Sequence, residues 1–338
     1  MKFDKKKNQA PMFRYNPTNL SKKDMKSMKF VEITKKQQDH FDTNGYLIVR
    51  NVIDESLIKK VTKACDTHMS KQPPPRNYYT NSFISAFEPG NEIITKLICN
   101  DLIVSLMVQL MSPEIVGGGR ANDFPNVGGQ VIYKHPQKPL DKPLKSFAHK
   151  FVHPGHPSEW NWHRDLNNWL PNDPRRGTVI IKVAFCLTDS KETDSGSTYF
   201  VPGSHKYTEQ ITINKNTGYP DKYIQPSVKA GDVYFFSSSI YHAVGPNFSD
   251  KISKKILIPY RYLWHNFIRF AEDPPVEKLI SGNQYKKFIP QHQQLFGKFI
   301  NSDFATRNQD GWMPNLPLRL WAQNNGYECD GPDMRLYK

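Results

Sequence analysis

Two histidines and one aspartate are the side chains of this sequence best suited to bind a metal ion. His163 and Asp165 are two residues apart, so on a β-strand both side chains leave the same face while Arg164 points away. His242, which follows an apolar segment much further along the chain, is the best candidate for a third ligand. Two imidazoles and one carboxylate leave other positions of a metal open, an arrangement that non-haem Fe(II) oxygenases use.

The composition favours a folded protein that is able to position such a site. The length of 338 residues suggests two domains of about 150 residues, but one all-β domain can reach about 250 residues. A hydrophobic fraction of 38% provides a core, while 26 prolines and 19 glycines predict many turns and long loops. A single enlarged domain is therefore consistent with the sequence.

The first third of the chain is predicted to contain short helices. Thr34 can cap a helix that runs to Phe41, and Asn44-Gly45 would end it before a short strand over residues 46–50. Apolar residues recur at helical spacing over residues 54–66 and again over residues 92–110, where core packing explains them.

Short β segments dominate after Gly129. Gly- and Pro-rich turns separate these segments, a pattern typical of a sandwich or jelly roll. The predicted strands cover residues 130–133, 160–165, 178–187, 197–201, 232–237 and 256–262.

The formal charge of +14 is unevenly distributed. Residues 1–29 hold nine lysines and arginines and two aspartates, so this segment carries half of the excess and is interpreted as a flexible, solvated basic arm. The remaining +7 is ordinary for a chain of this size, which disfavours a nucleic-acid partner.

The four cysteines argue for a reducing compartment. Cys65, Cys99, Cys186 and Cys329 are far apart and form no C-x-x-C pair, against a disulfide framework or a structural zinc site. The first 30 residues lack the apolar core of a signal peptide, and no run of 18 apolar residues exists. We expect a cytoplasmic monomer or homodimer without membrane contact.

The order of several motifs adds a family resemblance. After the His163-x-Asp165 pair come Val201-Pro202-Gly203-Ser204-His205-Lys206, then Gly231-Asp232, then His242 followed by Gly245-Pro246-Asn247. Over residues 34–263 the chain resembles the phytanoyl-CoA dioxygenase family of Fe(II)/2-oxoglutarate oxygenases.

The resemblance implies a mainly β fold with flanking helices and a double-stranded β-helix core, which is a cupin-like jelly roll. It also implies Fe(II) bound by His163, Asp165 and His242, with 2-oxoglutarate and O2 as cosubstrates and succinate and CO2 as products. The expected organisation is the arm over residues 1–30, the oxygenase domain over 31–265, and a helical and loop extension over 266–338 packed on the core.

The reaction expected from this resemblance is oxidation of an unactivated C–H bond in a small, anionic metabolite. Halogenating relatives lack the carboxylate ligand, so Asp165 disfavours halogenation, whereas hydroxylation, desaturation and oxidative cyclisation stay open. The same chemistry on a nucleic-acid or protein substrate, and a metal-binding jelly roll without turnover, are the alternatives.

One departure from the family concerns the cation for the distal carboxylate of 2-oxoglutarate. The family usually has an arginine eleven residues after the distal histidine, and this position is Ser253. A buried carboxylate without a cation is costly, so another residue must replace the arginine. The candidates are Lys182, Lys255 and Arg261, with Gln130 as a hydrogen-bond donor to the same cosubstrate.

The residues around the metal-binding segment are candidates for the substrate pocket. Trp162, Arg164, Asn167 and Trp169 are expected there, although core packing explains the tryptophans equally well.

Overall fold

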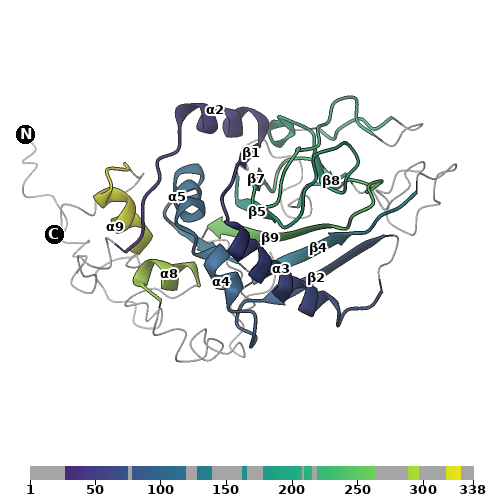
Figure 1. Ribbon diagram of the computed structural model, residues 1–338. Helices are drawn as coiled ribbons and strands as arrows, with labels where there is room; N and C mark the ends of the chain where they lie inside the picture. Colours follow the sequence, from purple (N-terminus) through teal and green to yellow (C-terminus); the bar gives the residue numbers. More distant parts are fainter. Residues whose placement is uncertain are drawn as a thin grey trace, which may run out of the picture.

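The computed structural model describes residues 27–74, 78–118, 128–138, 162–165, 178–207, 209–214, 219–262, 288–296 and 317–328. In this part of the chain, β-strands form the centre of the molecule and short helices lie beside them (Figure 1). None of the described helices is long and apolar enough to cross a membrane.

Helix α2 (Lys35–Asn44) begins with a capping box. The Thr34 side chain accepts a hydrogen bond from the backbone N–H of Gln37, and the Gln37 side chain accepts one from the backbone N–H of Thr34. Gly45 ends the helix at φ 77°, and a Cβ atom there would lie 2.6 Å from the His205 ring, so both backbone and space require glycine. Strand β1 (Tyr46–Val49) follows at once, as the sequence predicts.

A seven-stranded antiparallel sheet contains most of the β structure. The strands follow the order β1, β7, β5, β9, β4, β2, and β3 also pairs with β9. They are β2 (Tyr79–Ser85), β3 (Ile115–Gly117), β4 (Gly128–Lys134), β5 (Ile180–Cys186), β7 (Val233–Ser237) and β9 (Ser253–Tyr262).

Alternation along each strand gives this sheet two different faces. On β5, Ile181, Val183 and Phe185 join the core cluster that includes the helices, whereas Ala184 and Cys186 join a second cluster on the other face. Lys182 shares its face with Ala184 and Cys186. A one-residue change of register would exchange the two faces, so the apolar pattern specifies which side chains point inward.

The helices on the outer face are α3 (Glu55–Met69), α4 (Ile93–Ile98) and α5 (Asp101–Leu110). The helical character predicted over residues 92–110 is present, but it is divided between two helices, because the backbone of Asn100 is extended and its side chain caps α5 by accepting a hydrogen bond from Ile103 N–H at 3.2 Å. The apolar spacing continues across the break, so periodicity alone does not reveal it.

A smaller sheet closes the other side of the barrel. Strand β6 (Thr198–Phe200) pairs with β8 (His242–Val244), and the 3-10 helix η3 (Ser204–Lys206) follows β6. His163 forms a bridge with His242 at one edge, and Ile224 forms one with Phe200 at the other. Phe200 packs with Phe236 and Leu257 between the sheets, and the predicted jelly-roll fold class is confirmed.

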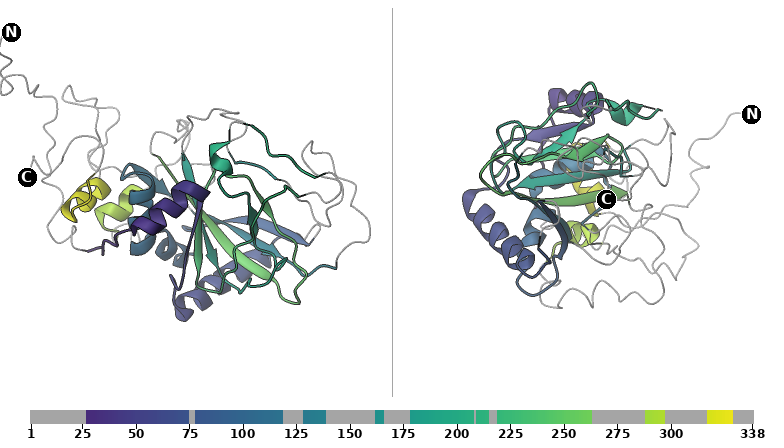
Figure 2. Two further views of the ribbon diagram at one scale, coloured as in Figure 1. Left: turned by 90° about the horizontal axis from the view of Figure 1, so that it is seen from above. Right: turned by 90° about the vertical axis from the view of Figure 1, so that its right-hand side faces the viewer.

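Two helices after the barrel pack at one end of the molecule (Figures 1 and 2). They are α8 (Pro290–Leu295) and α9 (Pro317–Asn324). Gln294 of α8 donates to the carbonyl oxygen of Pro113, and Trp321 of α9 donates to that of Met28 at 3.2 Å. The domain boundaries expected near residues 30 and 265 stay predictions.

Candidate metal centre and cosubstrate site

Backbone hydrogen bonds bring the three predicted metal ligands together. His163 and His242 exchange two N–H···O bonds of 3.0 Å, and Asp165 N–H donates to the Ser238 carbonyl oxygen at 3.0 Å. The short extended segment Trp162–Asp165 is thereby fixed against β8 and the turn before it. His163 and Asp165 leave the same face of this segment, as their spacing predicts.

The side chains of the three residues converge on one point. Asp165 Oδ1 lies 3.7 Å from His163 Nε2, and Asp165 Oδ2 lies 3.8 Å from His242 Nε2. One ligand atom from each residue lies within 4.8 Å of the others. The His163 side chain is 37% exposed, whereas those of Asp165 and His242 are largely buried, so the cluster opens to solvent on one side.

His242 is held in the form that can bind a metal. Its Nδ1 donates a hydrogen bond to the Ile240 carbonyl oxygen at 3.0 Å, which leaves Nε2 with a lone pair facing Asp165. Burial, together with the neighbouring His163, lowers the pKa of His242 to about 3. The imidazole is therefore neutral at physiological pH.

Asp165 is ionised although it is buried. Burial alone would raise its pKa, but Lys182 and the two histidines outweigh that effect and hold the pKa well below its ordinary value. Its Oδ2 atom is buried and accepts no hydrogen bond from the described residues. Because buried acceptors are normally paired, this oxygen together with two imidazole nitrogens fits a divalent metal such as Fe(II).

Lys182 lies beside this cluster. Its Nζ donates to Asp165 Oδ1 at 2.9 Å, and both side chains are mostly buried. The Lys182 backbone pairs with Phe236 and Pro259 on the neighbouring strands, which directs the side chain into the barrel. The ammonium therefore contacts Oδ1 of Asp165, whereas Oδ2 accepts no hydrogen bond from the described residues.

Lys255 also points into the barrel. It lies on β9, four residues before Pro259, which is the residue opposite Lys182. It lies between Ile132 on β4 and Cys186 on β5, is 4% exposed, and donates from Nζ to the Gly196 carbonyl oxygen at 2.9 Å. Burial lowers the pKa of its ammonium to about 8. No acid among the described residues pairs with it.

The other predicted cosubstrate residues lie on the same inner face. Gln130 is opposite Leu257 and is half-buried. Arg261 is buried at the far end of β9 from Lys255, opposite Ile180 and Val116. Burial lowers the pKa of its guanidinium to about 10.

The sequence interpretation missed Lys134. This buried lysine is paired in register with Ser253, the position where the family usually has its arginine. The two-residue spacing from Gln130 and Ile132 would have placed Lys134 on the inner face, but only the register between β4 and β9 brings it beside Ser253.

Trp162 and Arg164 lie on the opposite face of their segment from His163 and Asp165. Trp162 packs in a cluster with Tyr199 and Tyr241, and Arg164 stacks 4.1 Å from the centroid of the Tyr241 ring. Arg164 also donates to the carbonyl oxygens of Ser204 and Tyr207. Strand alternation turns both side chains away from the predicted ligands, and their role in the substrate pocket stays a prediction. Asn167 and Trp169 lie outside the described residues.

Comparison with known proteins places the chain in a family. The family model of phytanoyl-CoA dioxygenase matches residues 41–256, and the chain belongs to this family. An ectoine dioxygenase of Bordetella bronchiseptica is 22% identical over 283 residues, which cover 75% of this chain and 84% of that enzyme. The dioxygenase cdmA of Talaromyces verruculosus is 29% identical over 113 residues, 32% of this chain and 36% of that protein.

Among solved structures, HygX of Streptomyces hygroscopicus, with nickel and 2-oxoglutarate bound, resembles the chain with a TM-score of 0.49 and 14% identity. The match covers 68% of this chain and 88% of that one. As a member of the phytanoyl-CoA dioxygenase family, the protein is a non-haem dioxygenase that uses Fe(II), 2-oxoglutarate and O2. The predicted enzyme class and cofactors are confirmed.

Proposed function

We propose that the protein oxidises an unactivated C–H bond of a small, anionic metabolite at an iron held by His163, Asp165 and His242. The observation that carries this proposal is the convergence of one ligand atom from each residue within 4.8 Å, with Asp165 Oδ2 unpaired among the described residues. Two neutral nitrogens and one carboxylate oxygen are the donor set of iron oxygenases with open coordination positions. Hydroxylation, desaturation and oxidative cyclisation are the reactions that this site can support.

The iron and 2-oxoglutarate supply the oxidising chemistry, in which O2 is consumed and 2-oxoglutarate yields succinate and CO2. The protein contributes the ligands and the surroundings of the substrate. The Ile240 carbonyl oxygen orients the imidazole of His242, and Lys182 holds Asp165 Oδ1 so that Oδ2 faces the imidazole of His242.

We assign the distal carboxylate of 2-oxoglutarate to Lys255. This lysine is buried, has no acid partner among the described residues, and lines a small internal cavity together with Ser253, Ser197 and Tyr234. A buried ammonium beside hydroxyl groups is a suitable partner for a carboxylate. Lys182 is less suitable because Asp165 already pairs with it.

Similarity to a known dioxygenase supports a small-molecule substrate. The Bordetella bronchiseptica enzyme that is similar to 75% of the chain is named for ectoine, a small metabolite.

Anaerobic titration tests these assignments. Fe(II) and 2-oxoglutarate are added to the full-length protein, and the charge-transfer absorption of the complex gives the 2-oxoglutarate affinity. We expect Lys255→Met to weaken this affinity by at least about 30-fold, because a buried carboxylate loses its cation. Lys254→Met is the matched control, since Lys254 faces the other side of β9 and pairs with Asp66 at 2.7 Å. Lys182→Met should bind 2-oxoglutarate nearly as wild type.

Admission of O2 then tests turnover. Wild-type protein should release succinate, and His242→Ala should release none and lose the charge-transfer absorption. Iron binding without succinate release would favour a jelly-roll protein without turnover. An unchanged affinity in Lys255→Met, with a large loss in Lys182→Met, would transfer the carboxylate assignment to Lys182.

A further inference from the structure

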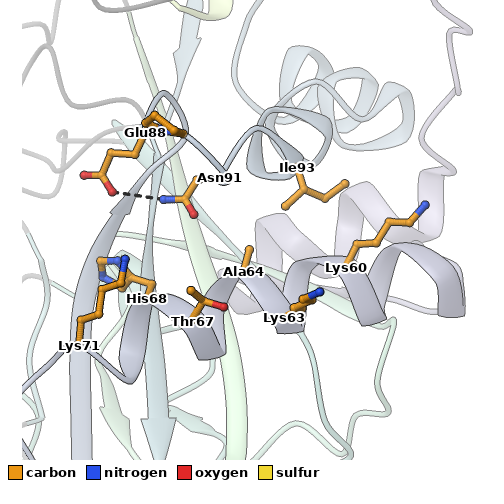
Figure 3. A pocket seen from close by; sticks show the side chains of 11 residues that line it. Lys60, Lys63, Ala64, Thr67, His68, Lys71, Glu88, Asn91 and Ile93 are labelled. Carbon is orange, nitrogen blue, oxygen red and sulfur yellow. Dashed lines mark hydrogen bonds between the residues drawn. The ribbon is translucent and has the colours of Figure 1, made fainter.

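A second hollow lies on the outside of the barrel, between α3 and the loop that leads into α4. Its cavity volume is about 420 Å³, within the usual range of about 300–1,000 Å³ for small-molecule sites. Figure 3 shows one wall formed by side chains of α3 and the other by the loop of Glu88 to Asn91 and by Ile93.

Three lysines line the α3 side of the hollow. Lys60 and Lys63 lie on one side of α3 because residues three apart share a helix face, and Lys71 follows the helix, which ends at Met69. None of the three forms an ion pair with an acid in the described ranges, whereas the adjacent Lys59 pairs with Glu55 at 2.6 Å and does not line the hollow.

The charge of the hollow is therefore positive. Among the described residues that line it, Glu88 is the only acid, and its Oε2 accepts a hydrogen bond from the Asn91 side chain at 3.3 Å. His68 is bonded to the Ser82 hydroxyl, and burial lowers the pKa of its imidazole, so it adds no charge at neutral pH. Three lysines and one glutamate give a net charge of about +2.

The floor and rim leave room for a ligand. Ala64 and Thr67 form the floor beside His68, and a Cβ atom added to Gly90 on the rim would meet nothing within 4 Å. None of the described lining residues is an arginine, the side chain whose planar fork binds carboxylates at two points. Lysine ammonium groups, as compact point charges, suit phosphate oxygens.

The hollow is separate from the metal centre. Val61 and Cys65 of α3 pack in the cluster that holds Val183 and Phe235, on the outer face of the large sheet. Lys182 and Lys255 project from the opposite face. A ligand in the hollow therefore cannot reach the metal ligands.

We infer that this hollow binds a small phosphate-bearing ligand carrying at least two negative charges, at a site distinct from the iron. The match of charge, the size of the cavity and the absence of described acid partners for three lysines on one wall support this assignment. A compact diphosphate group fits a bounded hollow better than an extended polymer, which would need a long continuous groove.

Inorganic pyrophosphate is the probe. Calorimetric titration is done on the full-length protein without added iron, since pyrophosphate would chelate the metal. The double variant Lys63→Gln/Lys71→Gln should bind pyrophosphate roughly tenfold more weakly than wild type. Lys59→Gln is the matched control on the same helix, and Lys182→Met controls for anions at the metal centre; both should bind as wild type. Thermal unfolding checks that the exposed substitutions leave the fold intact.

Several results would overturn the inference. These are no binding by wild type, an equal loss in Lys59→Gln, or a loss in Lys182→Met alone. A parallel titration with a short single-stranded oligonucleotide separates the two sources of phosphate: binding of the oligonucleotide without binding of pyrophosphate would identify a nucleic-acid surface instead.

Discussion

The carboxylate of Asp165 lies between the ammonium of Lys182 and the imidazoles of His163 and His242, and these neighbours determine its stability in the metal-free protein. The Lys182 Nζ to Asp165 Oδ1 distance is 2.9 Å, and both side chains are mostly buried. Removing one partner of such a pair leaves a buried charge that water compensates poorly. Bound metal would supply the missing positive charge.

Lys182→Met should therefore destabilise the metal-free protein by roughly 2 kcal/mol, a value reduced from that of a fully buried pair because both side chains keep some exposure. Added Ni(II) should stabilise the variant more than it stabilises wild type. Chemical denaturation with and without Ni(II) measures both effects. Lys191→Met, which breaks the exposed Lys191–Asp189 pair, is the control and should change stability little. A smaller Ni(II) effect in Lys182→Met than in wild type would contradict this account.

Lys255 predicts a pH dependence of cosubstrate binding. Because burial lowers its pKa to about 8, the cation is present below that pH and is lost as the pH rises through it. If the cation binds 2-oxoglutarate, the affinity should fall by about tenfold between pH 7 and pH 9. Lys255→Arg should show no such fall, since arginine stays charged.

Titration of 2-oxoglutarate into the Ni(II)-loaded protein at several pH values provides the measurement. The arginine variant controls for changes at the metal itself. An equal fall in both proteins would remove Lys255 from the cosubstrate site.

The sequence indicates the convergence of His163, Asp165 and His242 more directly than the surroundings of the cosubstrate cation, for a physical reason. Two of the ligands, His163 and Asp165, are fixed by local alternation on one strand. The position of the candidate cations depends on the register between β9 and its neighbours β4 and β5. This register brings Lys134 opposite Ser253 and places Lys255 between Ile132 and Cys186. No local pattern in the sequence specifies that pairing.

At the scale of elements, α5 acts as a polar clamp for the chain that precedes α2. Asp101, Ser105 and Gln109 are spaced by four residues and accept hydrogen bonds from the backbone N–H groups of Lys29, Val31 and Ile33. Gln109 also donates to the Val31 carbonyl oxygen at 2.9 Å. The helix thereby holds an extended segment without a β-partner.

Gln109→Ala removes the hydrogen bonds to both Val31 and Ile33 and leaves partly buried backbone groups unpaired. We expect a loss of roughly 2 kcal/mol in the free energy of unfolding. Gln38→Ala on α2 is the control, because Gln38 makes only an exposed hydrogen bond to Asp42 and its loss should cost little. Denaturant titration measures both variants, and equal stabilities would show that the clamp contributes nothing.

The sequence predicted helices and strands where helix caps and strand alternation mark them. It failed where tertiary contacts determine whether a segment becomes a strand. The Thr34 cap and Gly45 stop of α2 are both present. Strands β2 and β3 were missed because their sequences alternate weakly, and the sheet pairs β2 with β4 over its whole length. The break at Asn100 needed the capping hydrogen bond to be recognised.

At the scale of the whole molecule, the start of the described chain lies far from the metal centre. Met28 is buried against Trp321 of α9, and Figures 1 and 2 place α9 at the opposite end of the molecule from the loops around β8. The residues before Met28 carry a net charge of +6 out of the total of +14. The proposed oxidation at the metal centre therefore should not depend on residues 1–26.

Removal of residues 1–26 should leave the free energy of unfolding and succinate formation from 2-oxoglutarate unchanged. Removal of residues 1–33 should instead cost roughly 3 kcal/mol or more, because buried Met28 and the segment held by α5 are lost. Denaturation and succinate assays on both truncated proteins provide the comparison. A large, salt-sensitive loss of turnover in the shorter truncation would favour a macromolecular substrate drawn by the arm.

An anaerobic crystal structure of the full-length protein with Fe(II) and 2-oxoglutarate would show which residues bind the iron and the cosubstrate. We expect the metal to be bound by one nitrogen each of His163 and His242 and by one oxygen of Asp165, with the distal carboxylate of 2-oxoglutarate against Lys255. Iron bound elsewhere, or iron density without His242 among its ligands, would contradict the account.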